Sequence, residues 1–284
     1  MPTPLRMLIL ARGDSPRVTH ARTALTETLA QRRDIRIVDV LTTDDGDDDP
    51  PDSEFAIVIG GDGAILRACR SFGTRQRPIL GVNVGRLGFL ADLATDEVCH
   101  SIDRIAAREF HVTRHLMFVC EHTRADGSSE THLGLNEAAI MSAGSLSMID
   151  VHLEIDRQPV TTFSGDGLII STPVGSTAHS LSAGGPILRQ DLQAFVVTPI
   201  CPHALSMRSL VDSADVEYRM TSPSAPPGVM LVIDGQIKVP FAATDAATVK
   251  RAHVELQLAR MPGHSFYNTL HRKLGWAGQP KYSR

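Results

Sequence analysis

The 284-residue sequence lacks the patterns that mark several classes of protein. Its four cysteines stand far apart and form no C-x-x-C pair, which disfavours a disulfide framework or a zinc site and favours buried free thiols. No apolar run approaches the roughly 18 residues of a membrane span, and the N-terminal apolar stretch is too short for a signal peptide. We therefore predict a soluble, cytoplasmic protein that does not contact a membrane.

The sequence also lacks an excess of basic residues. The formal net charge is -4, and lysine and arginine are scattered through the chain instead of forming a stripe. A nucleic-acid partner is therefore not expected. The hydrophobic fraction of 42% is that of a globular chain with a proper core, and the length suits one large domain or two ordinary ones.

The sequence pattern differs between the first third of the chain and the part after about residue 110. The first third alternates apolar strands such as "RMLILA" (6–11) and "DIRIVDV" (34–40) with helical patterns, as an α/β domain does. From about residue 110, alternating or β-branched segments are separated by turn signals, which is typical of an all-β sandwich. We predict an α/β domain with a parallel sheet at residues 1–98, a β-sandwich at 99–264, and a helix within 265–284 that packs back on the first domain.

An acidic run, "TTDDGDDDPPD" (42–52), interrupts the first domain. Like charges beside two prolines predict a solvated loop rather than a cation site. No resident metal site is predicted.

The stretch "FAIVIGGDGAILR" (55–67) joins an apolar strand to a predicted helix through a glycine-rich turn that contains Asp62. The dinucleotide fingerprint G-x-G-x-x-G fails because Leu66 occupies the third glycine position, and G-x-x-x-x-G-K-[ST] is absent. A glycine-lined turn at a helix N-terminus still attracts anions, because its amides are unpaired. Asp62 fits either a helix cap or a functional carboxylate, and this motif alone leaves both open.

A second glycine-rich element is "SGDGLIISTPVGSTAHSLSAGGPIL" (164–188), a strand followed by a long polar loop. Ordering such a loop costs free energy unless it binds something. A Ser-His-Asp hydrolase is disfavoured because the G-x-S-x-G elbow is missing. A serine-rich surface loop is the alternative to a site that meets an adenine edge and ribose hydroxyls. The side chains that offer suitable donors and acceptors are Asp166, Ser176, Thr177, Ser180 and Ser182.

Asn136 and Glu137 form a third element, because they place two strongly polar side chains inside the apolar run "LGLNEAAIM" (133–141). Strand interiors rarely carry such a pair without partners. A ligand or a buried polar network is implied, and the sequence leaves both open.

Taken in order, these segments resemble the NAD kinase family over roughly residues 55 to 276. The "GGDG" motif is shared with diacylglycerol, sphingosine and phosphofructo-type kinases, whereas the block at 164–188 joined to "TPICPH" is highly specific. The matching stretches are "GGDG", "NVGRLGFL", "LNE", "GDGLIISTPVGSTAHSLSAGGPI", "TPICPHALSMRSLV", "DGQ" and "LHRKLGW".

The resemblance implies a diacylglycerol kinase- or phosphofructokinase-like α/β domain followed by a β-sandwich. It also implies Mg²⁺-dependent transfer of the terminal phosphoryl group of ATP or inorganic polyphosphate to the adenosine ribose 2′-hydroxyl of NAD, which gives NADP. A homodimer or homotetramer is the implied assembly.

The resemblance assigns roles to individual residues as well. Asp62 is the general base that accepts the proton of the ribose hydroxyl, and Mg²⁺ accompanies the phosphate donor. Gly61 and Gly63 let the donor phosphates approach the backbone, and Arg67 adds a positive contact. The implied NAD- and nucleotide-binding residues are Gly61, Gly63, Arg67, Asn136, Glu137, Asp166, Thr177, Ala178, His179, Ser180, Leu181, Ser182 and Gln236.

Several positions depart from the family pattern, among them Val174 in place of a common threonine and Ser209 in place of a common proline. Ala64 stands where the family commonly has threonine, and His179 stands where it usually has tyrosine. These changes favour a dinucleotide sensor without catalysis as one alternative, although retention of Asp62 opposes it. A lipid or sugar kinase that shares only "GGDG" is the other alternative, and the block at 164–188 opposes it. For Gln236, the preceding Asp234-Gly235 pair is a type I′ hairpin signal, so this glutamine can equally be an exposed turn residue.

Overall fold

The computed structural model describes residues 3–42, 50–91, 93–142, 148–263 and 265–275 of the chain. The chain divides into two compact units, the first formed by residues 1–114 and 256–284 and the second by residues 115–255. Most of the acidic run that we expect to form a solvated loop, residues 43–49, lies outside the described residues, as do residues 276–284 of the C-terminal segment.

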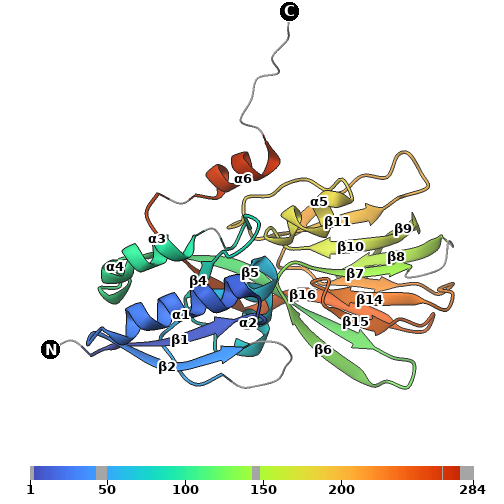
Figure 1. The fold of residues 1–284 in the computed structure, drawn as a ribbon. Coiled ribbons are helices and arrows are strands. Elements are labelled where there is room, and N and C mark those ends of the chain that lie inside the picture. The colour runs from blue at the N-terminus through green and yellow to red at the C-terminus, as the bar shows by residue number, and fades with distance from the viewer. Residues whose placement is uncertain (1–2, 43–49, 92, 143–147, 264, 276–284) are drawn as a thin grey trace, which may run out of the picture. The chain divides into compact units, whose positions relative to one another are not determined.

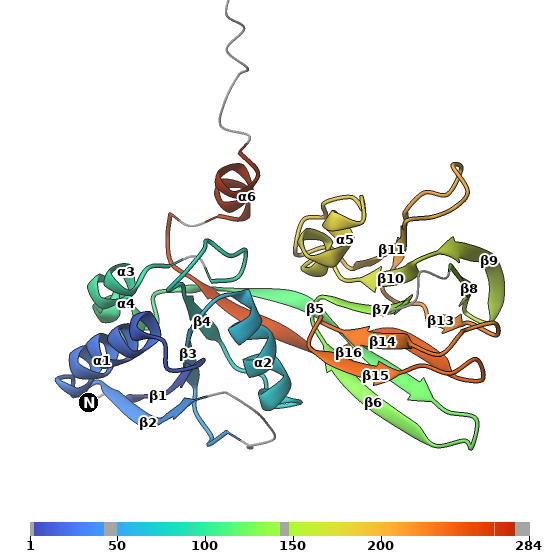
Figure 2. The same cartoon turned by 45° about the vertical axis from the view of Figure 1, so that its right-hand side comes forward.

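The first unit is built on a parallel sheet with the order β2-β1-β3-β4. Figure 2 shows α1, α3 and α4 on one face of this sheet and α2 on the other. Strand β3 is buried along its whole length, as expected for a strand that is covered on both faces. The elements are β1 (Leu5–Ala11), α1 (Pro16–Ala30), β2 (Ile35–Thr42), β3 (Phe55–Ile59), α2 (Asp62–Phe72), β4 (Ile79–Val82), α3 (Thr95–His100), α4 (Ile102–Ala106) and α6 (Phe266–Leu274).

Helix α1 shows how local sequence sets an element of this unit. Ser15 caps the helix, because its hydroxyl accepts the Val18 N–H at 3.4 Å, and Pro16 occupies the first turn. Val18, Ala21, Leu25 and Leu29 recur at helical spacing and are buried against the sheet.

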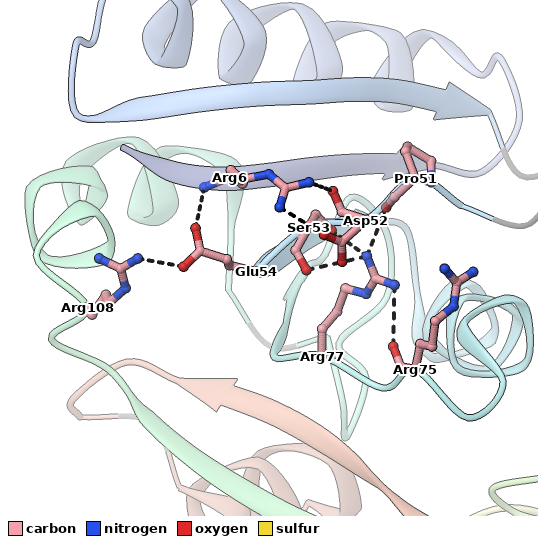
Figure 3. A network of polar contacts seen from close by, with 8 residues as sticks. All are labelled: Arg6, Pro51, Asp52, Ser53, Glu54, Arg75, Arg77 and Arg108. Carbon is pink, nitrogen blue, oxygen red and sulfur yellow. Dashed lines mark hydrogen bonds and ion pairs between the residues drawn. The ribbon is translucent and has the colours of Figure 1, made fainter. Parts of the chain in front are cut away.

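A polar network fixes the chain where it enters β3 (Figure 3). The Glu54 carboxylate accepts the backbone N–H of Arg6 at 3.1 Å and the guanidinium of Arg108 at 2.8 Å, and these contacts hold the pKa of Glu54 below its usual range. Arg77 is only 5% exposed, and it donates to the Ser53 hydroxyl at 2.7 Å and the Pro51 carbonyl at 2.9 Å. The network lies at the amino end of β3, so it anchors the strand from the end opposite the glycine-rich turn.

In its described residues, the second unit is built of strands with one short α-helix, α5 (Figure 1). A six-stranded antiparallel sheet has the order β12-β11-β10-β7-β14-β15, and a second layer contains β16-β13-β8-β9 with β5 and β6. A single apolar cluster takes side chains from both layers, which makes the unit a sandwich. The elements are β5 (His111–Thr123), β6 (Ser129–Gly134), β7 (Glu137–Ser142), β8 (Ile149–Ile155), β9 (Gln158–Gly165), β10 (Gly167–Ser171), the 3₁₀ turn η1 (Gly175–Thr177), α5 (His179–Ser182), β11 (Ala194–Ile200), β12 (Leu210–Ser213), β13 (Tyr218–Thr221), β14 (Val229–Ile233), β15 (Ile237–Pro240) and β16 (Ala246–Arg260).

The architecture confirms the predicted combination of an α/β domain with an all-β sandwich. The cysteine prediction was right in part, because all four thiols are free but their burial differs. Cys69 and Cys120 are buried and Cys99 is half-buried, whereas Cys201 is exposed. Cys201 follows the end of β11, where the chain turns with a φ of 44°, and its thiol donates to the Asp166 carboxylate.

Candidate active site

Asp62 stands where β3 passes into α2. Gly61 is the N-cap of α2 and makes no side-chain capping bond, so Asp62 is the first residue of the helix and not its cap. A side chain at Gly61 would meet no heavy atom within 4 Å, which leaves its backbone open to a ligand. At Gly60, where φ is 154°, a Cβ would lie 2.6 Å from the Ala64 Cβ, so turn and helix pack closely. Ala64 is therefore a buried packing residue.

The Asp62 carboxylate is held by three consecutive backbone amides of the loop after β4. Its Oδ2 accepts the N–H of Phe89 at 2.8 Å, and its Oδ1 accepts those of Leu90 at 3.0 Å and Ala91 at 3.1 Å. Gly88 permits this approach, because a Cβ there would fall inside contact distance of the whole carboxylate group. These bonds fix the direction in which the carboxylate faces.

The C-terminal segment of the same unit contacts this loop through Phe89. Lys273 of α6 places its Nζ 4.2 Å from the centre of the Phe89 ring and 4.0 Å from the Asp62 Oδ2. The Phe266 ring lies 6.1 Å from that of Phe89, and Arg260 donates to the Phe89 carbonyl at 3.0 Å. The family stretch "LHRKLGW" thus supplies a cation beside Asp62.

Asn136 and Glu137 lie in a buried polar network of the second unit, at the start of β7. The Asp234 carboxylate accepts the backbone N–H groups of Leu135 at 3.1 Å, Asn136 at 2.7 Å and Glu137 at 3.3 Å. The Asn136 carbonyl accepts the N–H of Thr172 at 2.9 Å. The turn before β7 is therefore held from β10 and from the β14–β15 hairpin.

Glu137 is only 4% exposed, and one of its carboxyl oxygens accepts the backbone N–H of His179. The other, Oε2, is buried and has no hydrogen-bond partner among the described residues. Burial and the negative charge of Asp234 raise the pKa of Glu137 to about 8, and the His179 N–H acts in the opposite direction. Burial also lowers the pKa of the His179 imidazole.

The long polar loop after β10 folds into η1 and α5. Some of its hydroxyl groups form hydrogen bonds within the second unit. Ser176 is fully buried, donates to the Pro173 carbonyl at 2.6 Å and accepts the Leu188 N–H at 3.0 Å. Ser180 is fully buried and shares a 2.9 Å hydrogen bond with Thr198. These two hydroxyls hold the loop in shape, so a ligand is not needed to satisfy them.

The other predicted binding residues of the second unit differ in exposure. Thr177 at the end of η1, Ala178 after it, and His179 and Leu181 of α5 are half-buried, and the His179 N–H reaches Glu137. The residues with exposed side chains are Asp166 and Ser182, and Gln236 is half-buried.

Strands β14 and β15 pair Ile233 with Ile237, which leaves three residues in the turn instead of the two of a type I′ hairpin. Gln236 is the last of these turn residues.

The structure thus joins Asn136, Glu137 and His179 in one network of the second unit, with Thr177 and Ala178 directly before His179 in the chain. Gly61, Asp62 and Gly63 lie at the start of α2 in the first unit, and Arg67 lies in the middle of the same helix. We predicted no role for Asp234, for the amides of residues 89–91 or for Lys273 from the sequence. All three lie within or next to stretches that match the family ("DGQ", "NVGRLGFL" and "LHRKLGW"), which was the available signal.

The described part of the chain contains neither a cluster of metal ligands nor a membrane-spanning helix. Within it, no group of three or more His, Cys, Asp or Glu side chains is placed to hold a metal ion. No helix in the same residues has the length and apolar character needed to cross a membrane.

The chain is similar to known proteins over most of its length. The family models of the ATP-NAD kinase N-terminal domain and C-terminal domain match residues 16–110 and 135–261. The NAD kinase of Rhodopirellula baltica is 40% identical over 97% of this chain and 88% of its own length. The NAD kinase of a Geobacter species is 34% identical over 95% and 98% of the two chains.

Solved structures share the fold. Yeast NADH kinase complexed with NADH superimposes with a TM-score of 0.86 at 22% identity, covering 99% of this chain and 91% of its own. An NAD kinase from Archaeoglobus fulgidus in complex with ATP gives a TM-score of 0.76 at 25% identity, covering 96% and 100%. With both family domains present and relatives that match over nearly the full length, the chain belongs to the NAD kinase family.

Proposed function

We propose that this chain transfers the terminal phosphoryl group of ATP or inorganic polyphosphate to the adenosine ribose 2′-hydroxyl of NAD, giving NADP. The observation that carries the proposal is the geometry of Asp62. An ionised carboxylate offers about four acceptor sites, and the amides of residues 89–91 occupy three of them. One site remains for the acceptor hydroxyl, on a carboxylate whose direction is fixed.

In the proposed step, Asp62 accepts the proton of the 2′-hydroxyl while the ribose oxygen attacks the terminal phosphorus. The bond from that phosphorus to the bridging oxygen breaks, and ADP or the shortened polyphosphate leaves with the electron pair. Gly61 and Gly63 and the first amides of α2 favour the donor phosphates, because the N-terminus of a helix carries a partial positive charge. Arg67, on the same helix, adds a full positive charge.

Mg²⁺ enters with the phosphate donor, as part of that substrate. The described residues place no three-ligand cluster that would hold the ion on the protein alone, and phosphoryl donors bring their own oxygen ligands.

For the acceptor, we propose that Asn136 and Glu137 meet the adenosine and that His179 packs on the dinucleotide. Asp166, Thr177, Ala178, Ser182 and Gln236 line the rest of the pocket, and Ser180 and Leu181 contribute through their backbone in α5. The names of the relatives support the acceptor, and the ATP complex of the archaeal relative supports ATP as a donor. A homodimer or homotetramer is the proposed assembly, which light scattering of the purified protein would test.

The test compares the wild type with Asp62→Asn. Asparagine keeps one oxygen, so the hydrogen bonds from the backbone N–H groups of Leu90 and Ala91 can persist, while the hydrogen bond from the Phe89 N–H is lost. We expect kcat to fall by about 10² to 10⁴-fold, the range for a lost general base, while the NAD dissociation constant changes less than about fivefold. Asp96→Asn, at an exposed aspartate in the first turn of α3, is the matched control and should retain full activity.

The assay measures NADP formed from NAD and Mg²⁺ with either ATP or polyphosphate, and calorimetry measures NAD binding. NAD binding without NADP from either donor would identify a dinucleotide sensor. Absence of NAD binding would leave the lipid or sugar kinase alternative. Full activity of Asp62→Asn would reject the role of Asp62 as general base and leave the NAD kinase activity standing.

A further inference from the structure

Asp234 has no place in the phosphoryl transfer step, yet it contacts both residues that we assign to the adenosine. It lies in the turn between β14 and β15, is 5% exposed and has a φ of 52°, which aspartate tolerates better than most residues. We propose that Asp234 is a positioning residue of the dinucleotide site, whose carboxylate fixes the backbone of residues 135–137 and thereby sets where Asn136 and Glu137 meet the ligand. The inference rests on the proposed NAD kinase activity.

The geometry is that of an anion seated in a backbone nest, where successive N–H groups converge on one acceptor. Asp234 Oδ1 accepts the N–H groups of Leu135, Asn136 and Glu137, and its Oδ2 also accepts that of Leu135, at 3.1 Å. A backbone hydrogen bond joins the same two segments, because the Asp234 N–H donates to the Glu137 carbonyl at 2.9 Å. The hairpin turn and the turn before β7 are therefore locked to each other.

The side chain of Glu137 distinguishes this network from one that serves stability alone. A closed structural network satisfies its buried polar atoms, but Oε2 of Glu137 is buried and has no partner in the described part of the chain. An unsatisfied oxygen of this kind is costly unless a ligand reaches it. Its place at the start of β7, beside the half-buried residues of η1 and α5, makes it a contact for a ribose or adenine group.

Asp234 also adds to the effect of burial on the protonation of Glu137. The groups that act on Glu137 are Asp234 from the β14–β15 turn and His179 from α5, which donates its backbone N–H. Burial raises the pKa of Glu137 most and the carboxylate of Asp234 raises it further, so Glu137 keeps its proton at neutral pH. A protonated Glu137 offers a donor and an acceptor to the ligand and adds no repulsion toward the pyrophosphate of NAD.

Two substitutions separate the mechanical contribution from the charge. Asp234→Asn keeps an oxygen at the Oδ1 position, which receives all three amides, but removes the charge. Asp234→Ala removes both. Asp245→Asn is the matched control, because Asp245 is also a buried aspartate of the second unit that accepts a backbone N–H, from Ala242 at 3.0 Å.

The experiment measures kcat and KM for NAD from pH 6 to 9.5, NAD binding by calorimetry, and the melting temperature of each variant. For Asp234→Ala we expect KM to rise about tenfold or more while kcat changes less than about threefold. For Asp234→Asn we expect a nearly unchanged KM at pH 7. The fall of kcat/KM at high pH, the alkaline limb of the profile, should move about one pH unit or more toward lower pH, because Glu137 then loses its proton more easily. Asp245→Asn should change the melting temperature without moving that limb.

Unchanged KM and NAD binding in folded Asp234→Ala, or an unmoved alkaline limb in Asp234→Asn, would overturn the inference while NADP formation by the wild type left the proposed function standing. A wild type that neither binds NAD nor forms NADP would overturn both.

Discussion

Replacing Gly88 by alanine tests the Asp62 geometry with a single methyl group. A Cβ at Gly88 would lie 2.7 Å from Cγ and 3.0 Å from Oδ2 of Asp62, and closer still to Oδ1. Gly88 is not in the left-handed region, so alanine adds contact and no backbone strain. The carboxylate then has to leave the three amides, or the loop that carries them has to move.

The size of the effect follows from these distances. Ordinary contact begins at 3.4 Å, so the carboxylate and the loop have to separate by roughly 1 Å. A misplacement of about 1 Å in a catalytic group costs on the order of 10²-fold in rate, or about 2.7 kcal/mol of transition-state stabilisation. Losing one hydrogen bond to a charged group costs about 1.5 to 3 kcal/mol, so the free energy of unfolding should fall by a similar amount.

The assay measures kcat for NADP formation and the free energy of unfolding in urea for Gly88→Ala and for Gly85→Ala. Gly85 lies in the same loop, where an added Cβ meets no atom within 4 Å, so its alanine variant should keep kcat within about threefold of the wild type. A Gly88→Ala protein with wild-type kcat and stability would refute the inferred position of the base.

Three further predictions follow from charged or titratable groups. Lys273→Met keeps an apolar stem over Phe89 but removes the cation near Asp62; because both charged side chains are partly exposed, kcat should fall less than about fivefold, and the difference from wild type should shrink in high salt. Burial lowers the pKa of His179 from its usual 6.5, so KM for NAD should change with pH below about 6.5, and His179→Tyr should flatten that change; an unaltered profile would contradict contact with the dinucleotide.

Glu137 has a folded-state pKa of about 8 against a usual 4.5, so the folded protein holds a proton that the unfolded chain releases, and its contribution to stability is present below pH 4.5 and lost as pH rises toward 8. Glu137→Gln should remove this loss, which reaches up to about 1.4 kcal/mol per pH unit, and unfolding at pH 5.5 and pH 8 measures it.

Much of the fold was predictable because burial leaves a periodic mark on the sequence. The apolar run at 6–11 became β1 at Leu5–Ala11, and the β-branched segments after residue 110 became the strands of the second unit. The turn around Asp62 was predictable too, since an apolar strand, three glycines and a helical pattern are adjacent in sequence.

Partners far apart in the chain could not be predicted in this way. Asp62 is bound by amides 27 to 29 residues later, and Asp234 by amides 97 to 99 residues earlier. Ser180, an apparent ligand contact in the sequence, turned inward to Thr198.

The sequence by itself determined the two-domain class, the family stretches and the candidate residues, because these depend on local periodicity and on residue identity. Only the tertiary structure decided which atoms hold Asp62 and Glu137 in place. Hydrogen bonds act over about 3 Å, and which groups come within that distance depends on how the strands and loops pack.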